Sequence, residues 1–160
     1  MSIIKISVIT ITYNAENVIM RTLDSVLKQT FSNIEHIIID GASKDSTLLA
    51  EREYESRSCS TNNGHEIKII SEPDKGLYDA MNKGIGKATG NYLVFLNAGD
   101  VFPSSSTLET VADMIGDGEE LPGVLFGDTD IVDDNGNFLR HRRLSPPAHL
   151  NWRSFMFGML

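Results

Sequence analysis

Short, strongly apolar segments alternate along the chain with longer segments whose apolar residues recur at helical spacing. Residues 3–12 (IIKISVITIT) are β-branched almost throughout, which is typical of a strand buried on both faces of a parallel sheet. Three further segments of strand character lie at residues 34–39, 66–71 and 92–96. These patterns predict four strands of one sheet.

Helical patterns lie between these strands. Asn14 is expected to cap a helix that ends near residues 29–30, and a second helix begins after Asp45 and fades into a loop over residues 58–64. The apolar face of a third helix is expected to consist of Leu77, Met81, Ile85 and Ala88. Strands alternating with helices predict an α/β fold with a mostly parallel sheet covered by helices on both faces.

The later part of the chain changes character. A short helix is expected at residues 107–115, and residues 124–132 and 138–143 predict a β-hairpin with an Asn135-Gly136 turn. The 160 residues suit one compact domain, and no convincing linker divides them.

Composition and charge narrow the function classes. The chain is 41% hydrophobic and 22% charged, as in ordinary globular proteins. The net charge of -8 argues against a nucleic-acid partner, and it implies that a diphosphate ligand needs a metal ion. Cys59 is the only cysteine, which fits a reducing cytoplasm. No apolar run or signal-peptide pattern predicts membrane insertion or secretion.

Three polar clusters stand at predicted strand ends, at residues 10–14, 40–45 and 97–100. The carboxyl ends of parallel strands meet at one edge of a sheet, so these clusters are expected to converge on one cleft. Asp40 is equally a candidate to accept hydrogen bonds from a base or ribose and to support its own turn. Asp100 is a candidate ligand of a hard divalent cation, although a lone aspartate more often supports a turn or caps a helix.

A charged segment, residues 72–84 (EPDKGLYDAMNKG), surrounds the expected start of the third helix. Asp74, Lys75 and Asp79 stand at or just before its amino terminus, where free N–H groups and a partial positive charge suit a phosphate. A charged turn followed by an acidic first helical turn is the alternative, and the segment by itself does not decide between them.

Taken together, these segments resemble family-2 glycosyltransferases of the GT-A fold, especially the bacterial cell-surface polysaccharide subgroup. The matching blocks run in order to Asp128; they are SVITITYNAE, SVLKQTF, EHIIIDGASKDST, EPDKGLYDAMNKGIGKATGNYLVFLNAGD and FGD. The resemblance implies a Rossmann-like, mostly parallel sheet with helices on both faces and a β-hairpin near the carboxyl end.

The resemblance also assigns functional positions. The residues it places at the nucleotide sugar are Thr10, Tyr13, Asn14, Asp40, Asp74, Lys75, Asp79, Asn82, Asn97, Ala98 and Gly99. It places Asp100 at the metal, which implies Mg²⁺ or Mn²⁺ as cofactor. The usual motif is Asp-x-Asp, and here only Asp100 keeps a carboxylate. Metal affinity without nucleotide is therefore expected to be weak.

The implied activity is a hexosyltransferase type of reaction, in cell-surface polysaccharide biosynthesis. A sugar would pass from a nucleotide diphosphate sugar, expected to be a UDP-sugar, to a polysaccharide or lipid-linked acceptor with inversion. The metal would stabilise the leaving diphosphate, and a general base would deprotonate the acceptor. Asp128 is the one catalytic candidate within these residues, although its FGD element resembles one that lines the sugar and acceptor pocket, and the base itself is expected beyond the hairpin.

The carboxyl end, WRSFMFGML, resembles the stretch before the acceptor and catalytic-base segment. We therefore expect residues 1–160 to be a single nucleotide-sugar-binding GT-A domain that lacks this segment, with a nucleotide- and metal-binding fragment without transferase activity as the alternative. A nucleotidyltransferase or other Rossmann-like nucleotide enzyme is disfavoured, because the sequence contains neither GxGxxG after the first strand nor GxxxxGK[ST].

Three further features have structural interpretations as their first choice. His36 is expected to be a packed histidine, not a metal ligand. Residues 141–143 (HRR) are expected to be a solvated strand end, with contact to a diphosphate or an anionic lipid-linked acceptor as the alternative, consistent with peripheral association at the inner face of the membrane. Exposed apolar residues in the truncated chain would favour homo-oligomers; they are Trp152, Phe155, Met156 and Phe157.

Overall fold

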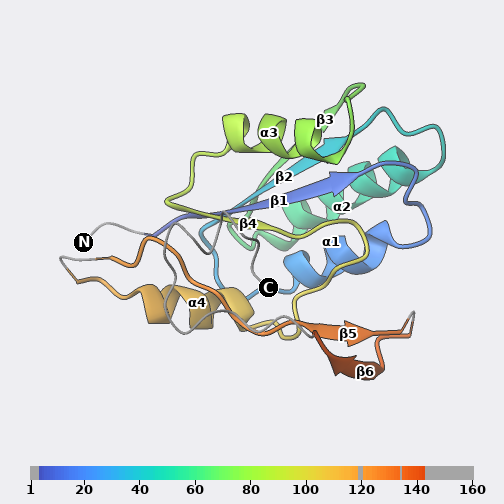
Figure 1. The fold of residues 1–160 in the computed structure, drawn as a ribbon. Coiled ribbons are helices and arrows are strands. Elements are labelled where there is room, and N and C mark those ends of the chain that lie inside the picture. Colours follow the sequence, from blue (N-terminus) through green and yellow to red (C-terminus); the bar gives the residue numbers. More distant parts are fainter. Residues whose placement is uncertain (1–3, 119–120, 134, 143–160) are drawn as a thin grey trace. The chain divides into compact units, whose positions relative to one another are not determined.

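The computed structural model describes residues 4–118, 121–133 and 135–142. Its first compact unit, residues 1–119, contains a four-stranded parallel sheet with the strand order β3-β2-β1-β4 (Figure 1). The strands are β1 (Ile6–Thr12), β2 (Ile34–Asp40), β3 (Glu66–Ser71) and β4 (Tyr92–Phe95). Every residue of β1 and β2 is buried, because these central strands are covered on both faces. The sequence prediction of the sheet is confirmed.

Helices cover the two faces of this sheet (Figure 1). They are α1 (Ile19–Leu27), α2 (Thr47–Thr61), α3 (Leu77–Lys87) and α4 (Thr107–Ile115). On one face, Ile9 and Ile37 pack against Ala80 of α3. On the other, Ile38 packs against Leu23 of α1 and Tyr54 of α2, while Leu108 of α4 joins a cluster around Ile6 and Val8 of β1. The α/β fold with helices on both faces is thus confirmed.

The second compact unit, residues 120–160, contains the predicted hairpin. Its strands β5 (Asp130–Val132) and β6 (Phe138–His141) pair antiparallel, with an irregularity in register between Ile131 and Val132. The first strand is shorter than predicted. The carboxyl-terminal residues 152–160, with their expected apolar surface, lie outside the described residues. The single-domain interpretation stays a prediction.

Three details of the helices differ from the sequence predictions. Asn14 does not cap α1, because its backbone is left-handed (φ 47°) and Val18 stands at the cap position. Helix α2 continues to Thr61 through part of the expected loop, held by its buried Tyr54 and Ser58. In α3 the buried face is formed by Ala80 and Gly84, while Leu77 and Ile85 are about half exposed.

Glycine explains the rotation of α3. A Cβ atom at Gly84 would lie 2.5 Å from Cγ2 of Ile9, so the bare backbone at this position lets the helix approach the sheet closely. The expected apolar stripe is confirmed at Met81 and Ala88, which pack against the sheet cluster, but the buried face turns towards Ala80 and Gly84 and away from Leu77 and Ile85.

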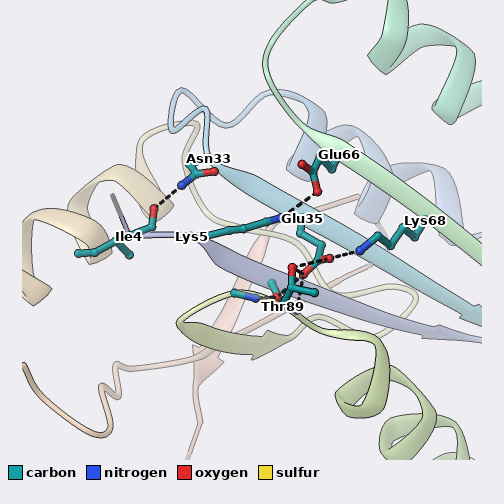
Figure 2. A network of polar contacts seen from close by, with 9 residues as sticks. Ile4, Lys5, Asn33, Glu35, Glu66, Lys68 and Thr89 are labelled. Carbon is teal, nitrogen blue, oxygen red and sulfur yellow. Dashed lines mark hydrogen bonds and ion pairs between the residues drawn. The ribbon is translucent and has the colours of Figure 1, made fainter. Parts of the chain in front are cut away.

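A buried carboxylate ties the amino-terminal edge of the sheet together (Figure 2). Glu35 of β2 is fully buried and accepts hydrogen bonds from Ser7 Oγ at 2.8 Å and from the backbone N–H of Thr89 at 2.8 Å. The Lys68 ammonium of β3 pairs with its other oxygen. Burial would raise the pKa of Glu35, but the hydrogen bonds from Lys68, Thr89 and Ser7 outweigh it and lower the pKa to about 2.

Among the described helices, none combines the length and apolar character that crossing a membrane requires.

Candidate functional site

The three polar clusters converge at the carboxyl edge of the sheet. Thr12 of β1 is the register partner of Asp40 of β2, and Asp40 is the partner of Ser71 of β3. On the other side of β1, the backbone N–H of Ala98 donates to the carbonyl of Ile11 at 3.1 Å. The ends of β1, β2 and β4 therefore lie next to one another, as the sequence predicts.

Asp40 is fully buried, and its carboxylate is already hydrogen-bonded. The Ser71 hydroxyl donates to Oδ2 at 2.6 Å, the Ser43 backbone N–H donates to the same atom at 3.1 Å, and the Ser43 hydroxyl donates to Oδ1. These contacts correspond to the turn-supporting role of Asp40, which is one of the two roles that the sequence left open. A role in base recognition stays a prediction.

Five hydrogen bonds join the loop after β1 to the loop after β2, and we call them the loop clamp. In each of them a backbone N–H of one loop donates to a side-chain oxygen of the other. The bonds run from Asn14 N to Ser43 Oγ (2.8 Å), Lys44 N to Asn14 Oδ1 (2.9 Å), Ala15 N to Thr47 Oγ1 (2.8 Å), Glu16 N to Asp45 Oδ2 (3.1 Å) and Ser46 N to Glu16 Oε2 (2.9 Å). Asn14 therefore uses its side chain to fix the neighbouring loop. The clamp holds the two loops at the carboxyl edge of the sheet in one arrangement.

Sequence reasoning missed the contributions of Glu16, Asp45 and Thr47 to this clamp. Asp45 Oδ1 accepts hydrogen bonds from the Thr47 hydroxyl at 2.6 Å and from its backbone N–H at 3.0 Å, and the Thr47 bonds lower the pKa of Asp45. An Asp-x-Thr pattern just before a helix is a known local signal for such side-chain to backbone bonds. That signal predicts the turn, although not its partner loop.

Tyr13, Gly41 and Asp74 lie together beside the clamp. Tyr13 is 61% exposed, so its ring is available to a ligand. A Cβ atom at Gly41 would lie 2.6 Å from Oδ2 of Asp74 and 3.1 Å from Cδ2 of Tyr13. Only glycine leaves room for both side chains here. Gly41 therefore shapes the site, a role that the sequence alone did not reveal.

The start of α3 uses both of its acidic residues as hydrogen-bond acceptors. Asp74 Oδ1 accepts from the N–H of Gly76 at 2.8 Å, and Asp79 Oδ2 accepts from the N–H of Lys75 at 3.1 Å. These bonds agree with the second interpretation of this segment, a charged turn followed by an acidic first helical turn. Contact between the start of α3 and a phosphate stays a prediction. Lys75 is exposed, and Asn82 lines a hollow beside the edge strand β3 with Ile70 and Glu72 among its neighbours.

The turn after β4 is formed by Asn97, Ala98, Gly99 and Asp100. The N–H of Asp100 donates to the carbonyl of Asn97 at 2.9 Å, and that of Gly99 donates to Thr22 Oγ1 of α1 at 2.8 Å. Gly99 has a φ of 102°, which side-chain-bearing residues rarely adopt. The turn is thereby fixed to α1 while Asp100 faces solvent.

This turn has the donor chemistry of a weak divalent-cation site. Within the described part of the chain, the Asp100 carboxylate makes no hydrogen bond or ion pair, and the buried Oδ1 of Asn97 has no partner. The exposed carboxylate of Asp100 is an oxygen ligand of the kind that suits Mg²⁺ or Mn²⁺. No described group of three or more His, Cys, Asp or Glu side chains is arranged to hold a metal. A cation at Asp100 would thus take most of its ligands from a diphosphate and water.

Two predicted residues lie elsewhere. Thr10 is fully buried, and its hydroxyl contacts Nε2 of His36 at 2.9 Å, while Nδ1 of His36 contacts the Tyr54 hydroxyl at 2.7 Å. Burial, with a smaller contribution from His65, lowers the pKa of His36 to about 3. The packed histidine was predicted, but Thr10 faces this interior layer and not the cleft surface. Asp128 is exposed and belongs to the second unit, so it is described apart from the cleft.

Comparison with known proteins identifies the family. The model of glycosyl transferase family 2 matches residues 7–159. This chain belongs to that family. A PGL/p-HBAD biosynthesis glycosyltransferase of Mycobacterium tuberculosis is 37% identical over 122 residues, covering 76% of this chain and 45% of the relative. The amylovoran biosynthesis glycosyltransferase AmsB of Erwinia amylovora is 31% identical over 160 residues, covering 97% of this chain and 51% of that protein.

Solved structures confirm the GT-A fold. The structure of S. aureus TarS 1–349 in complex with UDP-GlcNAc is similar with a TM-score of 0.59 and 28% identity, covering 69% of this chain and 31% of that solved chain. The mannosyltransferase PcManGT from Pyrobaculum calidifontis, in complex with GDP-Man and Mn²⁺, gives a TM-score of 0.60 at 28% identity, covering 71% of this chain and 33% of that one. The chain spans about half the length of the curated relatives it matches.

Proposed function

We propose that this family 2 chain binds a nucleotide diphosphate sugar together with Mg²⁺ or Mn²⁺, and that the whole protein is an inverting glycosyltransferase acting in cell-surface polysaccharide biosynthesis. The observation that carries this proposal is the convergence of the loop clamp, the Asp40 turn and the Asn97–Asp100 turn at one edge of the sheet. Asp100, whose carboxylate has no partner among the described residues, stands in the last of these turns and would hold a cation that stabilises the diphosphate.

The similar proteins support the donor class. TarS binds UDP-GlcNAc, and PcManGT binds GDP-Man and Mn²⁺, so the fold accepts nucleotide sugars with either base. For this chain we propose a UDP-sugar. The acceptor is proposed to be a polysaccharide or a lipid-linked glycan, supported by the printed roles of relatives in amylovoran and PGL/p-HBAD biosynthesis.

The described residues divide into three tasks in this proposal. Tyr13 stacks on or borders the base, with the Asp40 turn and the loop clamp fixing its position. Lys75 and the start of α3 face the phosphates, where the exposed ammonium and the helix amino terminus favour negative charge. The exposed carboxylate of Asp100 holds the cation. The bound cation would stabilise the negative charge that develops on the leaving diphosphate.

The acceptor side of the reaction involves the second unit. We propose that Asp128 lines the sugar and acceptor pocket, and that the general base belongs to a segment outside residues 1–160. The exposed strand β6 carries Arg140 and is followed by Arg142. These cations support a location in the cytoplasm at the inner face of the membrane, where they would face an anionic lipid-linked acceptor.

Isothermal titration with UDP and GDP, each with and without Mn²⁺, tests the donor proposal, and a sugar-release assay with UDP-sugars tests the activity. Metal-dependent UDP binding with sugar release supports the full proposal. Binding without release would reduce the chain to a nucleotide- and metal-binding module. If neither nucleotide binds at millimolar concentration, the donor-site proposal is wrong.

A further inference from the structure

Helix α2 presents one buried face to the sheet, and that face contains a carboxyl group. Its buried residues are Thr47, Glu51, Tyr54 and Ser58, which recur at helical spacing. The side chain of Glu51 is fully buried, and neither of its carboxyl oxygens has a hydrogen-bond partner among the residues that the structure describes. A buried carboxyl group without partners needs an explanation, because most buried polar groups are hydrogen-bonded.

Glu51 lies one helical turn after Thr47 on the buried face of α2, and the Thr47 hydroxyl accepts the N–H of Ala15 in the loop clamp. The other titratable and charged side chains on α2 itself are Arg52, Glu53, Tyr54, Glu55, Arg57 and Cys59. On the elements packed against α2 they are Glu35, His36 and Asp40 of β2, Arg21 and Asp24 of α1, Glu66 and Lys68 of β3, and Glu16 and Asp45 of the two clamped loops. Of these, Asp40 and Asp45 are the acidic groups whose charges act on Glu51 directly. The register partner of Asp40, Thr12, adds a buried hydroxyl that also lacks a described partner.

An ionised Glu51 would be costly in this position. An unpaired buried carboxylate loses its hydration, and the Asp40 and Asp45 carboxylates repel it. Burial first, and the charge of Asp40 second, raise the pKa of Glu51 to about 8. Burial without partners therefore favours the protonated form of Glu51 at neutral pH, in which the carboxyl group has one O–H donor.

We infer that Glu51 is a positioning residue, which keeps the Asp40–Ser43 turn in its binding geometry as long as its carboxyl group is protonated. When Glu51 ionises, a negative charge appears in the same buried layer as Asp40. Opening the turn lets water hydrate this charge. The same opening breaks the bonds from Ser43 to Asp40 and the clamp bond from Asn14 to Ser43. The effect on the turn follows from the buried layer alone, whereas the effect on donor affinity rests on the proposed function.

The affinity experiment compares the wild-type protein with Glu51→Gln, which keeps the shape of the side chain but has no ionisable group. Both are titrated with UDP in the presence of Mg²⁺ at pH 7.0 and pH 9.0. With a pKa near 8, about one tenth of the wild type has a protonated Glu51 at pH 9.0, so its affinity should fall by roughly tenfold more than that of Glu51→Gln. Titration of the ligand and of other groups affects both proteins alike and cancels in the comparison.

A second measurement does not depend on any ligand. Hydrogen exchange of the Ser43 amide reports the bond to Asp40 directly. Between pH 7.0 and 9.0 this amide should lose protection in the wild type relative to Glu51→Gln, while buried β1 amides such as that of Val8 keep theirs. Glu51→Met, of similar size and without a polar group, replaces Glu51→Gln if the amide variant does not fold.

The outcomes separate the two proposals. If UDP binds neither protein at pH 7.0, the donor-site proposal fails, and the Ser43 exchange alone decides the role of Glu51. If wild type and variant show the same pH dependence of Ser43 exchange, Glu51 does not position the turn. A variant that changes the melting temperature but not the pH profiles would likewise show a merely structural role.

Discussion

Replacing Gly41 by alanine should disturb the nucleotide site while leaving the sheet intact. The added Cβ would lie 2.6 Å from Oδ2 of Asp74, and carbon and oxygen do not approach so closely without one of them moving. The backbone at Gly41 is not in the left-handed region, so no backbone strain accompanies the change. The side chain of Asp74 must therefore swing away.

The magnitude follows from the contact that Asp74 would lose. Its Oδ1 accepts the N–H of Gly76 at 2.8 Å at the start of α3, and a hydrogen bond to a charged group contributes about 1.5–3 kcal/mol. Because this bond is half-exposed, we expect a loss of about 1–1.5 kcal/mol in stability. If Asp74 and Tyr13 border the donor, UDP affinity should fall roughly tenfold, which corresponds to about 1.4 kcal/mol.

Isothermal titration of UDP with Mg²⁺ measures the affinity, and chemical denaturation measures the stability. Gly86→Ala is the matched control, since no described atom lies within 4 Å of its added Cβ and alanine favours a helix interior over glycine by about 1 kcal/mol. It should bind UDP as the wild type does. If Gly41→Ala loses the expected stability but binds UDP with unchanged affinity, Asp74 and Tyr13 do not border the nucleotide-sugar donor.

Two further predictions concern stability. The pKa of Glu35 is lowered to about 2 from an ordinary 4.5, so its contribution is present above pH 4.5 and is lost as the pH falls towards 2. The full shift corresponds to about 3 kcal/mol; because Lys68 is 42% exposed, we expect about 1–2 kcal/mol after screening. Urea denaturation at pH 7 and pH 3 should show this loss in the wild type and not in Glu35→Gln, and equal losses in both would contradict it. Gly84→Ala should destabilise by about 1–2 kcal/mol, because overpacking against Ile9 outweighs the helix propensity of alanine; a variant as stable as Gly86→Ala would contradict the close packing of α3.

The sheet was predictable because its strands carry an unambiguous signal. β-Branched segments such as residues 6–12 and 34–40 are buried on both faces, and the turn residues that follow them define the cleft edge. His36 was also predictable as a packed residue, since no other His or Cys stands at metal-ligand spacing. These inferences depend on local composition alone.

Features that depend on contacts between distant segments were not predictable. The loop clamp pairs residues about thirty positions apart, such as Asn14 with Lys44, and no local pattern specifies that partner. The face of α3 was predicted only in part, at Met81 and Ala88, because Gly84 adds nothing to an apolar stripe although its missing side chain lets the helix approach Ile9. No local pattern marks Glu51 as buried, because only the packing of α2 places its side chain in the interior.

The most direct test of the account is the effect of Asp100 on metal-dependent nucleotide binding. UDP affinity is measured by titration with and without Mn²⁺ for the wild type, for Asp100→Ala, and for Asp113→Ala, whose exposed carboxylate on α4 serves as control. The account predicts that Mn²⁺ strengthens UDP binding in the wild type and in Asp113→Ala, and that this gain disappears in Asp100→Ala while the fold is retained. A gain from Mn²⁺ in Asp100→Ala equal to that of the wild type would contradict the placement of the cation at the turn after β4.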